Sequence, residues 1–465
     1  MSLLDLSRWQ FAITVMFHMT FPAITVGLSI FLSVVHGLYW RTGKAVYLQM
    51  FRFWRRIFAV GFAIGVVAGA VITFQMGLNW GVYGARTGPV IGPIIGMEVV
   101  TAFFVEAGFI GVLLYGEGRV RNGTVFLSTV MVALGTVLSS TWIIAANSWM
   151  QTPAGYQVVH GRFEPTDWMR VIFNPSFLWR WPHMLAAVLI SAAFFVAGIS
   201  AWYLVKGRAK GFARRSMSIA LGVAALLMPV QLYLGDNVAG HQLPHQLSKL
   251  EAIEGNWGNG DTGFVLFAIP DQQAARNIAE LGIPCLGSYI AKDLTCGTAM
   301  PGLKLTPAAD RPDMAATFWG FRVMFLAAVL MFGTVFAATV LRIRNRLWTA
   351  RRFHRFVLWT TPAGILAILG GWVTAEAGRQ PWIVFGRLRT SDAVSHLAPG
   401  EVLFSVIGFS ALYLFMLAAY VAYIVRTLRI GPERDDPRNE PSPQDGPVPV
   451  AELPTPLAPR EVAAR

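Results

Sequence analysis

Six side chains that bind metals or move protons lie inside apolar stretches of the chain. They are His18, Glu98, Glu106, His183, Met324 and Glu376. An ionisable side chain within a hydrophobic span is costly to bury unless it binds or relays something. Histidine, methionine and carboxylate side chains suit haem iron as axial ligands. The set therefore predicts redox cofactors held between helices.

His183 and Met324 are the candidate ligands of a six-coordinate, low-spin haem that transfers electrons. They can share one iron if their two spans are neighbours. A single His18 or Glu376 would leave an open iron position, where dioxygen can bind. The alternative for Met324 is ordinary core packing, because the chain has 17 methionines. The alternative for the histidines is a hydrogen bond to a neighbouring helix.

Glu98 and Glu106 are candidates for proton transfer. Eight residues of α-helix separate them by about 12 Å along the axis and by about 80° around it. That distance is too long for direct transfer but suits a relay through water. Ser139, Ser140 and Asn147 could line such a path. The alternative for these three is ordinary hydrogen bonding between helices.

The composition places these residues in a membrane protein. The 465 residues are 55% hydrophobic and 14% charged, and the mean hydropathy is +0.52, whereas soluble domains are about 25% charged. About 20 apolar residues cross a bilayer. We predict one all-α, polytopic membrane domain over residues 1–430, with nine transmembrane helices in a bundle. The spans are expected at 9–38, 57–80, 93–116, 124–146, 183–205, 216–236, 317–341, 356–377 and 402–426.

Basic residues set the expected topology. They cluster in alternate short loops, at 41–56, 119–121, 206–215, 342–355 and 426–438. The positive-inside rule places these loops in the cytoplasm, with the N-terminus outside and the C-terminus inside. The net charge of +13 is then a topology signal, and we expect no nucleic-acid partner. All six chemistry-bearing residues should lie in the outer half of the membrane or near its middle.

Two segments fall outside the spans. The outer loop at 237–316 is expected to be ordered only against the rest of the protein. It contains Cys285 and Cys296, for which a disulfide or two free thiols remain open. Residues 431–465 are rich in Pro, Glu, Asp and Arg, which predicts a disordered cytoplasmic tail.

Short motifs along the chain resemble one known family. Gly378-Arg379-Gln380-Pro381-Trp382 resembles the GRQPW signature of subunit I of cytochrome bd-type quinol oxidases. The segments Leu6-Ser7-Arg8-Trp9-Gln10-Phe11-Ala12, Glu98 to Glu106 and Trp142 to Gln151 resemble that family as well. The resemblance covers residues 5–430. The chain lacks the long insert before the seventh span that some members have, so it resembles the short-loop branch, which includes cyanide-insensitive oxidases.

The resemblance implies three haems: a low-spin haem b, a high-spin haem b and a haem d. His183 and Met324 fall where the family places the two ligands of the low-spin haem. His18, Glu376 and Glu98 would serve the other two, in an order that stays open. Trp372 matches the end of the eighth span. Arg8, Arg322 and Arg379 are expected partners for haem propionates, with an interfacial anchor as the alternative for Arg8.

The segment Lys249-Leu250-Glu251-Ala252-Ile253-Glu254 resembles the family's quinol-loop motif. Lys249 and Glu254 thereby inherit a quinol-site role, Lys249 polarising a quinol oxygen and Glu254 accepting a proton. The family oxidises ubiquinol or menaquinol at the outer face of the bacterial inner membrane and reduces dioxygen to water. It generates proton motive force without pumping, with protons delivered from the cytoplasm by Glu106 and then Glu98.

The resemblance also implies partners, namely a membrane-embedded subunit II and a small single-span accessory subunit. Two other functions remain open at this point. One is a quinol-binding b-type electron carrier that does not reduce oxygen, and the other is a transporter without a cofactor. The three glutamates Glu98, Glu106 and Glu376 argue against a pure electron carrier, because such a carrier needs no proton path.

Overall fold

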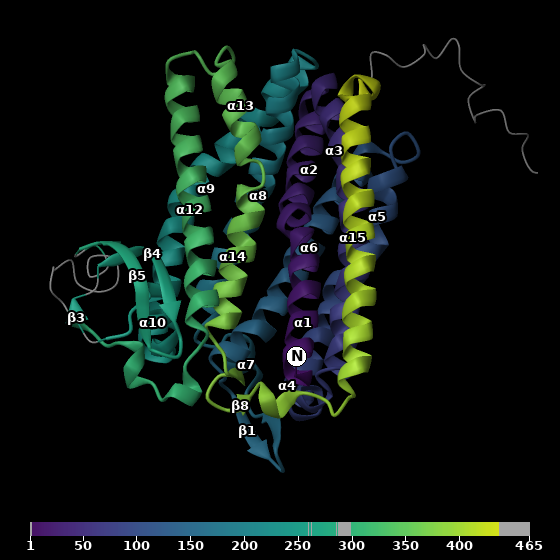
Figure 1. Ribbon diagram of the computed structural model, residues 1–465. Coiled ribbons are helices and arrows are strands. Elements are labelled where there is room, and N and C mark those ends of the chain that lie inside the picture. Colours follow the sequence, from purple (N-terminus) through teal and green to yellow (C-terminus); the bar gives the residue numbers. More distant parts are fainter. Residues whose placement is uncertain (1, 259, 262, 285, 287–298, 437–465) are drawn as a thin grey trace, which may run out of the picture.

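The fold is a bundle of long helices (Figure 1). It was obtained as a computed structural model and describes residues 2–258, 260–261, 263–284, 286 and 299–436. Within these residues, nine helical stretches are long and apolar enough to cross a membrane. They are Leu3–Thr42, Ala45–Gly77, Gly81–Tyr115, Asn122–Gln151, Phe177–Lys206, Lys210–His245, Met314–Ile343, Arg351–Ala377 and Pro399–Ile430. The prediction of a nine-span helical membrane protein is confirmed.

The individual elements follow one another with short connections. The helices are α1 (Leu3–Thr20), α2 (Pro22–Thr42), α3 (Ala45–Gly77), α4 (Gly81–Glu98), the π-helix η1 (Val99–Phe103), α5 (Phe104–Tyr115), α6 (Asn122–Gln151), α7 (Trp168–Ile172), α8 (Phe177–Lys206), α9 (Lys210–His245), α10 (Leu247–Glu254), α12 (Met314–Ile343), α13 (Arg351–Thr360), α14 (Ala363–Ala377) and α15 (Pro399–Ile430). Short 3₁₀ helices are η2 (Leu303–Leu305), η3 (Ala308–Asp310), η4 (Ser391–Ala393) and η5 (Pro432–Asp435). The strands are β1 (Tyr156–Val159), β2 (Arg162–Pro165), β3 (Gly260–Asp261), β4 (Phe264–Asp271), β5 (Arg276–Ile283), β6 (Ala299–Met300), β7 (Trp382–Val384) and β8 (Leu388–Arg389).

Proline explains where two of the nine stretches are divided. Pro22 is the first residue of α2, and Pro362 is the N-cap of α14. A proline lacks the backbone N–H, and its ring clashes with the carbonyl of the residue four before it, so it begins a helix more easily than it continues one. The first stretch is thereby split into α1 and α2, and the eighth into α13 and α14. Most helices also run several residues past the predicted apolar cores, because polar end residues continue the same helix.

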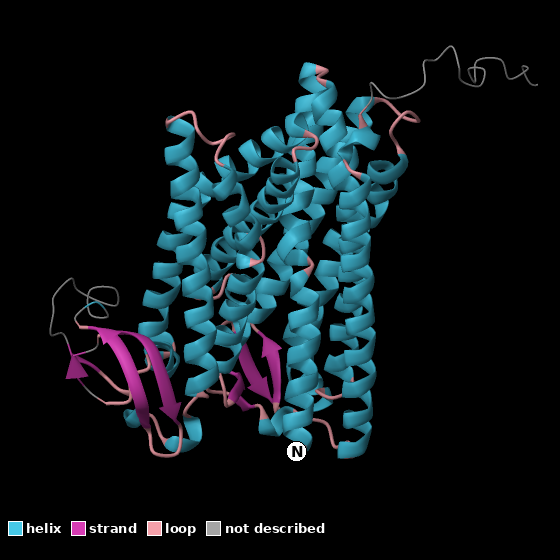
Figure 2. Ribbon diagram, turned by 45° about the horizontal axis from the view of Figure 1, so that its top comes forward, coloured by secondary structure: helices cyan, strands magenta, loops and turns pink. Residues whose placement is uncertain are grey.

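The two ends of the bundle differ in structure. Strands lie only at one end in Figure 2, among the described residues. We call it the hairpin end, and it carries α10, the hairpins β1–β2 and β4–β5, and the pair β7–β8. The opposite end, called the basic end, carries the loops with clustered arginine and lysine. The first residues of α1 lie at the hairpin end and the last residues of α15 at the basic end (Figure 1).

Four helices form a ring that matters for the site. Helix α8 packs against α9 and α14, and α12 packs against the same two helices. Among the described residues, α8 and α12 do not pack on each other to a comparable extent. They therefore occupy diagonal positions in the ring and are not the direct neighbours that the sequence argument took as its condition for a shared iron. A pair of ligands on α8 and α12 would meet across the inside of the ring instead.

The described part of the loop at 237–316, predicted to be ordered only against the rest of the protein, contains regular elements of its own. Helix α9 extends to His245, and α10 follows at once. Strands β4 and β5 pair antiparallel, from Phe264 opposite Ile283 to Asp271 opposite Arg276. The loop also packs on the bundle, since the Phe267 and Trp319 rings lie 5.3 Å apart. Cys285 and Cys296 lie outside the described residues.

The segment predicted as a tail begins with η5, which lies against α3. Gln49 of α3 donates a hydrogen bond to the Pro432 carbonyl (2.9 Å), and Arg56 forms an ion pair with Asp435. Residues 437–465 lie outside the described part of the chain, so the prediction for them stays a prediction.

Candidate functional site

His183 lies near the hairpin end of α8, facing α9. Gln231 of α9 lies 3.4 Å from His183 Nε2. The Nδ1 atom is buried and has no hydrogen-bond partner. A buried polar atom without a partner is uncommon, and a binding place for a ligand or a water is one of its ordinary causes. The ring thus retains a capacity for one more contact.

Met324 lies on α12, diagonally across the ring from α8. Its thioether is packed against the backbone of α14: a Cβ added at Gly371 would lie 2.9 Å from Met324 Sδ. A similar relationship holds for His183, where a Cβ at Gly235 of α9 would lie 3.3 Å from Cε1. Glycines on the two intervening helices, α14 and α9, therefore leave room beside both candidate ligands.

His18 lies close to the break between α1 and α2 and contacts α3. Its Nδ1 lies 3.1 Å from the Gly65 carbonyl oxygen, which can only accept, so Nδ1 carries the proton. This fixes the neutral tautomer that leaves Nε2 as an acceptor, the arrangement usual for a metal-binding histidine. A Cβ at Gly69 would lie 3.1 Å from His18 Cε1.

Glu376 is the centre of a polar cluster at the end of α14. Arg379, one turn later, forms an ion pair with it. Asn147 of α6 donates to Glu376 Oε1 (3.0 Å), and Arg180 of α8 donates to Asn147 Oδ1 (2.6 Å). Three transmembrane helices thus meet at one carboxylate.

Gln151, the last residue of α6, connects this cluster to the outer loop. Its Nε2 donates to Glu376 Oε1 (3.3 Å) and to the Ala375 carbonyl (3.2 Å). Its Oε1 accepts from Lys249 Nζ and from Gln246 Nε2 (3.0 Å). Lys249 also donates to Gln246 Oε1 (2.6 Å). A continuous hydrogen-bond chain therefore runs from α10 to Glu376.

Lys249 is unusual because its side chain is 2% exposed without an ion pair to any described carboxylate. Burial, followed by the positive charges of Arg180 and Arg379, holds the pKa of the Lys249 amine well below its usual range. A buried ammonium loses its hydration, so the neutral amine is favoured. Lys249 can therefore change protonation more easily than an ordinary lysine.

Glu254, at the end of the same helix, has a buried Oε2 with no partner. Burial raises the pKa of its carboxyl group, and the nearby Arg322 opposes that rise. Arg322 is itself 1% exposed. Its Nε and Nη1 donate to the carbonyls of Val265 (2.6 Å) and Ile253 (3.1 Å).

Several buried guanidinium nitrogens have no partner. Those near Glu376 and Glu254 are Arg322 Nη2, Arg379 Nε and Nη1, and Arg180 Nη1, and one more, Arg56 Nε, lies at the basic end. Leaving such donors buried and unpaired is costly, and a guanidinium fits a carboxylate with two hydrogen bonds. A haem carries two propionate carboxylates. Arg379 retains two unpaired nitrogens for such a contact and Arg322 retains one, so the residues are compatible with the predicted role, which stays a prediction. Arg8 is exposed at the hairpin end and has no part in this cluster, so its propionate role stays a prediction.

Glu98 and Glu106 lie on either side of η1. Ser139 of α6 donates to Glu98 Oε1 (2.8 Å), whereas Ser140 bonds its own helix at Val137 (2.7 Å). Glu106 is 6% exposed, and a Cβ at Gly135 would lie 2.5 Å from its Cγ. The expected angle of about 80° assumed a continuous α-helix and does not apply, because a π-helix has a wider turn and is frequent at functional sites.

Along their helices, five of the six residues lie midway or in the half nearer the hairpin end, whereas Glu106 lies in the half nearer the basic end. Glu98 lies midway along Gly81–Tyr115, which begins well before the expected start at 93. The predicted depths in the membrane stay a prediction. Trp372, four residues before Glu376 in α14, lies beside Phe11, and the two ring centroids are 6.5 Å apart.

Sequence reasoning missed Arg180, Gln151 and Gln231 as members of the site. Arg180 lies outside the predicted fifth span, which begins at 183, whereas α8 begins at Phe177. Gln151 appeared only as the end of a motif. A buried charge just inside a span is a signal that would have found Arg180. Nothing in the sequence alone indicates which partner Gln151 would bind.

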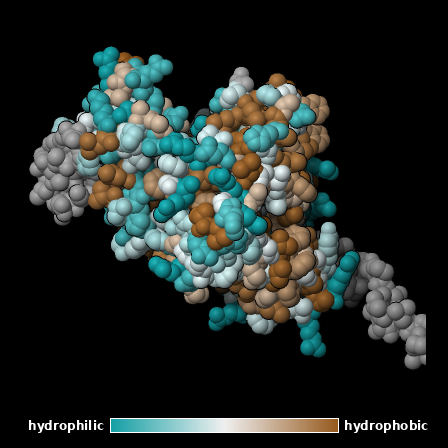
Figure 3. Space-filling view, turned by 90° about the horizontal axis from the view of Figure 1, so that it is seen from below, coloured by the Kyte–Doolittle hydropathy of each residue, from teal (hydrophilic) through white to brown (hydrophobic). Residues whose placement is uncertain are grey.

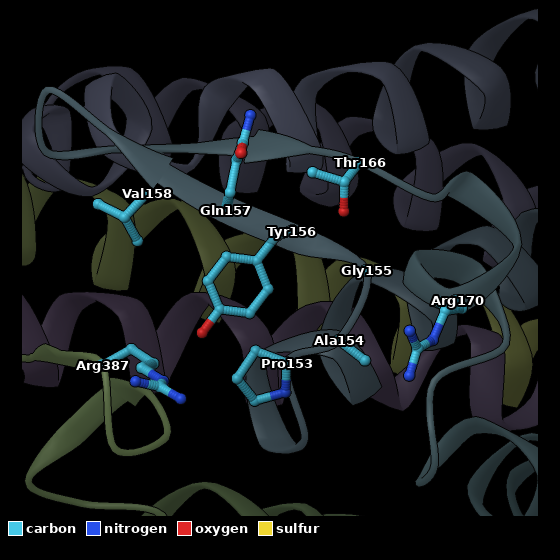
Figure 4. A pocket seen from close by; sticks show the side chains of 9 residues that line it. All are labelled: Pro153, Ala154, Gly155, Tyr156, Gln157, Val158, Thr166, Arg170 and Arg387. Carbon is cyan, nitrogen blue, oxygen red and sulfur yellow. The ribbon is translucent and has the colours of Figure 1, made fainter.

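An open cleft of about 510 Å³ lies elsewhere at the hairpin end. Figure 4 shows Arg170 and Arg387 toward its two sides with Tyr156 between them. None of the predicted site residues lines it. Figure 3, which looks onto this end, shows hydrophilic residues over the hairpins and hydrophobic residues along much of the rim of the bundle.

Comparison with known proteins gives concordant results. The family described as "Cytochrome bd terminal oxidase subunit I" matches residues 6–432. A Bacillus subtilis protein named "Cytochrome bd ubiquinol oxidase subunit 1" is 33% identical over 95% of this chain and 97% of its own length. The Escherichia coli "Cytochrome bd-II ubiquinol oxidase subunit 1" is 31% identical over 92% of this chain and 97% of its own. The bd oxidase structure from Geobacillus thermodenitrificans superposes with a TM-score of 0.84 at 28% identity, covering 92% of this chain and 98% of the other.

Proposed function

The chain belongs to the family of cytochrome bd terminal oxidase subunit I, and we propose that it takes electrons from quinol at the hairpin end and delivers them to dioxygen, which is reduced to water. Family membership makes it a multi-pass membrane oxidoreductase of respiratory electron transport, of the haem-binding quinol oxidase type. The residue roles that follow are part of the proposal.

One observation carries the proposal furthest, namely the hydrogen-bond chain from Lys249 through Gln151 to Glu376. A buried lysine in an extramembrane helix has no structural need to reach a carboxylate on a transmembrane helix. This hydrogen-bond chain is explained if a substrate bound at α10 must be close to a redox centre bound beside Glu376. We assign α10 and the loop around it, within 237–316, as the quinol site.

The candidate ligands are sufficient to hold three haem groups. His183 and Met324 would hold a low-spin haem b inside the ring of α8, α9, α12 and α14. His18, Glu376 and Glu98 would hold a high-spin haem b and a haem d. Arg322 and Arg379 would bind propionates with their unpaired nitrogens. Bound haem supplies one-electron transfer and an iron site that binds dioxygen.

At the quinol site, side chains of this protein stabilise the charge on the quinol and accept its proton. Lys249 donates a hydrogen bond to a quinol oxygen and so stabilises the negative charge that develops there as the proton leaves. The Glu254 carboxylate, on another side of α10, accepts that proton through water, and its buried setting keeps its proton affinity above that of an ordinary glutamate. Arg322, on the neighbouring α12, keeps the carboxylate form accessible.

A second set of groups handles the protons needed to form water. Glu106, nearer the basic end, receives protons from that side and passes them to Glu98, which Ser139 orients. With the basic end in the bacterial cytoplasm, protons are consumed from the inside and released at the hairpin end outside. This separates charge across the inner membrane without a pump. A membrane-embedded subunit II and a small single-span subunit complete the complex, and α15, mostly exposed along its length, offers them or lipid a contact face.

An absorption spectrum of the purified complex tests the proposal. A reduced-minus-oxidised spectrum with both b-type bands and a red chlorin band is expected for an oxidase. Bands of b type alone would indicate a quinol-binding electron carrier, and the absence of a Soret band would indicate a transporter. Either of those results contradicts the proposal.

A further inference from the structure

Glu251 is a buried acid that the proposed function does not use. It lies in α10 between Lys249 and Glu254 and is 1% exposed. Both of its carboxylate oxygens are buried and have no hydrogen-bond partner. Buried carboxyl groups are almost always hydrogen-bonded, so an acid with two unpaired oxygens calls for an explanation. Packing does not supply one, because an apolar side chain would fill the same space without the cost.

The position of Glu251 on α10 relates it to Glu254. The two residues are three apart in one helix, so their side chains are neighbours on the same face. Lys249 is two residues before Glu251 and therefore points to a different side, where it contacts Gln151 and Gln246. Helix α10 thus presents its amine toward the bundle, and the spacing of three residues puts the two carboxyl groups on one side of the helix, without a hydrogen bond between them.

The surroundings of Glu251 keep it free to change protonation. Helix α10 packs against α9, α12 and η2. Arg322 of α12 acts on Glu254, but no charged group of these elements, Lys304 of η2 included, contributes to the shift at Glu251. Burial alone raises the pKa of Glu251 to about 7. Both protonation states are therefore accessible near neutral pH.

Quinol oxidation must dispose of two protons, and the proposed function names an acceptor for only one. We propose that Glu251 is the second acceptor: it takes the first proton from Glu254 through intervening water, so that Glu254 is free to receive the second. This inference rests on the assignment of α10 as the quinol site.

The step balances. Both O–H bonds of the quinol break, and its two electrons leave one at a time to oxidised haem as quinone forms. The two protons reside on Glu251 and Glu254 and then pass to water at the hairpin end. Both carboxylates are thereby restored for the next quinol.

The test uses the complete purified complex carrying Glu251→Gln, which keeps the shape but cannot accept a proton. We expect the turnover with quinol to fall about tenfold, below the usual effect of losing a general base because Glu254 remains, with KM little changed. The infrared reduced-minus-oxidised difference spectrum should lose one carbonyl-stretch signal of a protonated carboxyl group. Glu251→Asp should restore part of the turnover and return that signal at a shifted frequency. Glu280→Gln, which removes an exposed carboxylate of the same loop, is the matched control and should change neither readout.

The outcomes separate this inference from the proposed function. If Glu254→Gln impairs quinol oxidation while Glu251→Gln keeps wild-type turnover and the full infrared signal, Glu251 is not an acceptor and the quinol site stands. If neither variant affects quinol oxidation, the quinol site itself is wrong. If Glu251→Gln does not assemble with haem, Glu251→Asp is used instead. A pH profile of quinol oxidation and an infrared signal that both equal those of wild type in Glu251→Asp would overturn the inference.

Discussion

Lys249 of α10 and Glu376 of α14 share one hydrogen-bonding partner, the side-chain amide of Gln151. Its Oε1 accepts from the lysine, and its Nε2 lies 3.3 Å from the carboxylate. An amide can do this because it has an acceptor at one atom and a donor at the other. A residue of the outer loop and a residue at the end of a membrane span are thereby held in a fixed relationship.

Replacing Gln151 should weaken that relationship. In Gln151→Leu the buried Lys249 amine keeps Gln246 but loses one acceptor, at a cost of about 1–3 kcal/mol. We expect turnover with quinol to fall roughly tenfold, while the haem spectrum keeps its bands. Steady-state quinol oxidation measures the change. Gln49→Leu is the control, because Gln49 is also a buried glutamine but bonds to Pro432 at the basic end; an equal loss in both variants would argue against a specific link.

Met324→Leu tests the low-spin haem. Leucine has a similar volume but no sulfur to bind iron, so the low-spin haem b signal should disappear or become high-spin while the chlorin band stays. Optical and electron paramagnetic resonance spectra of the complex report this. Met331→Leu, on the same helix and buried in the apolar core, should leave the spectrum intact. A normal low-spin signal in Met324→Leu would rule out the His183–Met324 pair.

Ser139→Ala tests the proton path. Glu98 loses the hydrogen bond that orients it, so dioxygen reduction should slow by about 5- to 20-fold, on the order of 1–2 kcal/mol. Reduction of the low-spin haem by quinol without dioxygen should keep its rate. The adjacent Ser140→Ala removes a hydroxyl that bonds only its own helix and should have little effect. Equal slowing in both serine variants would assign the loss to helix packing.

The pH dependence of quinol oxidation should have an acid limb set by Glu254. Burial raises the pKa of this carboxyl above its ordinary value of 4.5, and only the carboxylate accepts a proton. Activity should therefore rise with pH through that raised pKa, and kcat/KM of the free enzyme reports the position of the limb. In Glu254→Gln the activity should be low and the limb should move or vanish. An acid limb that persists at the same pH in Glu254→Gln would assign it to another group.

The raised pKa of Glu254 also sets the direction in which protein stability changes with pH. Because the folded-state pKa of Glu254 is raised, its contribution to the free energy of unfolding is complete below 4.5 and is lost as the pH rises through the raised value. The variant Glu254→Gln removes this loss, so it should melt at a higher temperature than wild type at alkaline pH and close to wild type at acid pH.

The sequence was sufficient for the bundle, because each span is a long apolar run that only a helix can carry through lipid. It also indicated His183 and Glu376, since such side chains are rare within spans, whereas Met324, one of 17 methionines, was indicated by the family resemblance. It was not sufficient for Arg180 and Gln151. Their importance depends on where α6, α8 and α10 meet, and a hydropathy pattern contains no information on that meeting point. The π-helix η1 could not be predicted from the sequence for a similar reason, because its residues are as apolar as those of the α-helix around it.

The central claim is that electrons from quinol reach dioxygen through this chain. The most direct measurement is dioxygen consumption by the purified complex supplied with quinol, recorded together with the quinone and any hydrogen peroxide formed. We predict two quinols oxidised per dioxygen consumed, with water as the product, because dioxygen takes up four electrons and each quinol gives two. Rapid reduction of b-type haem by quinol without any consumption of dioxygen would contradict the claim and identify an electron carrier.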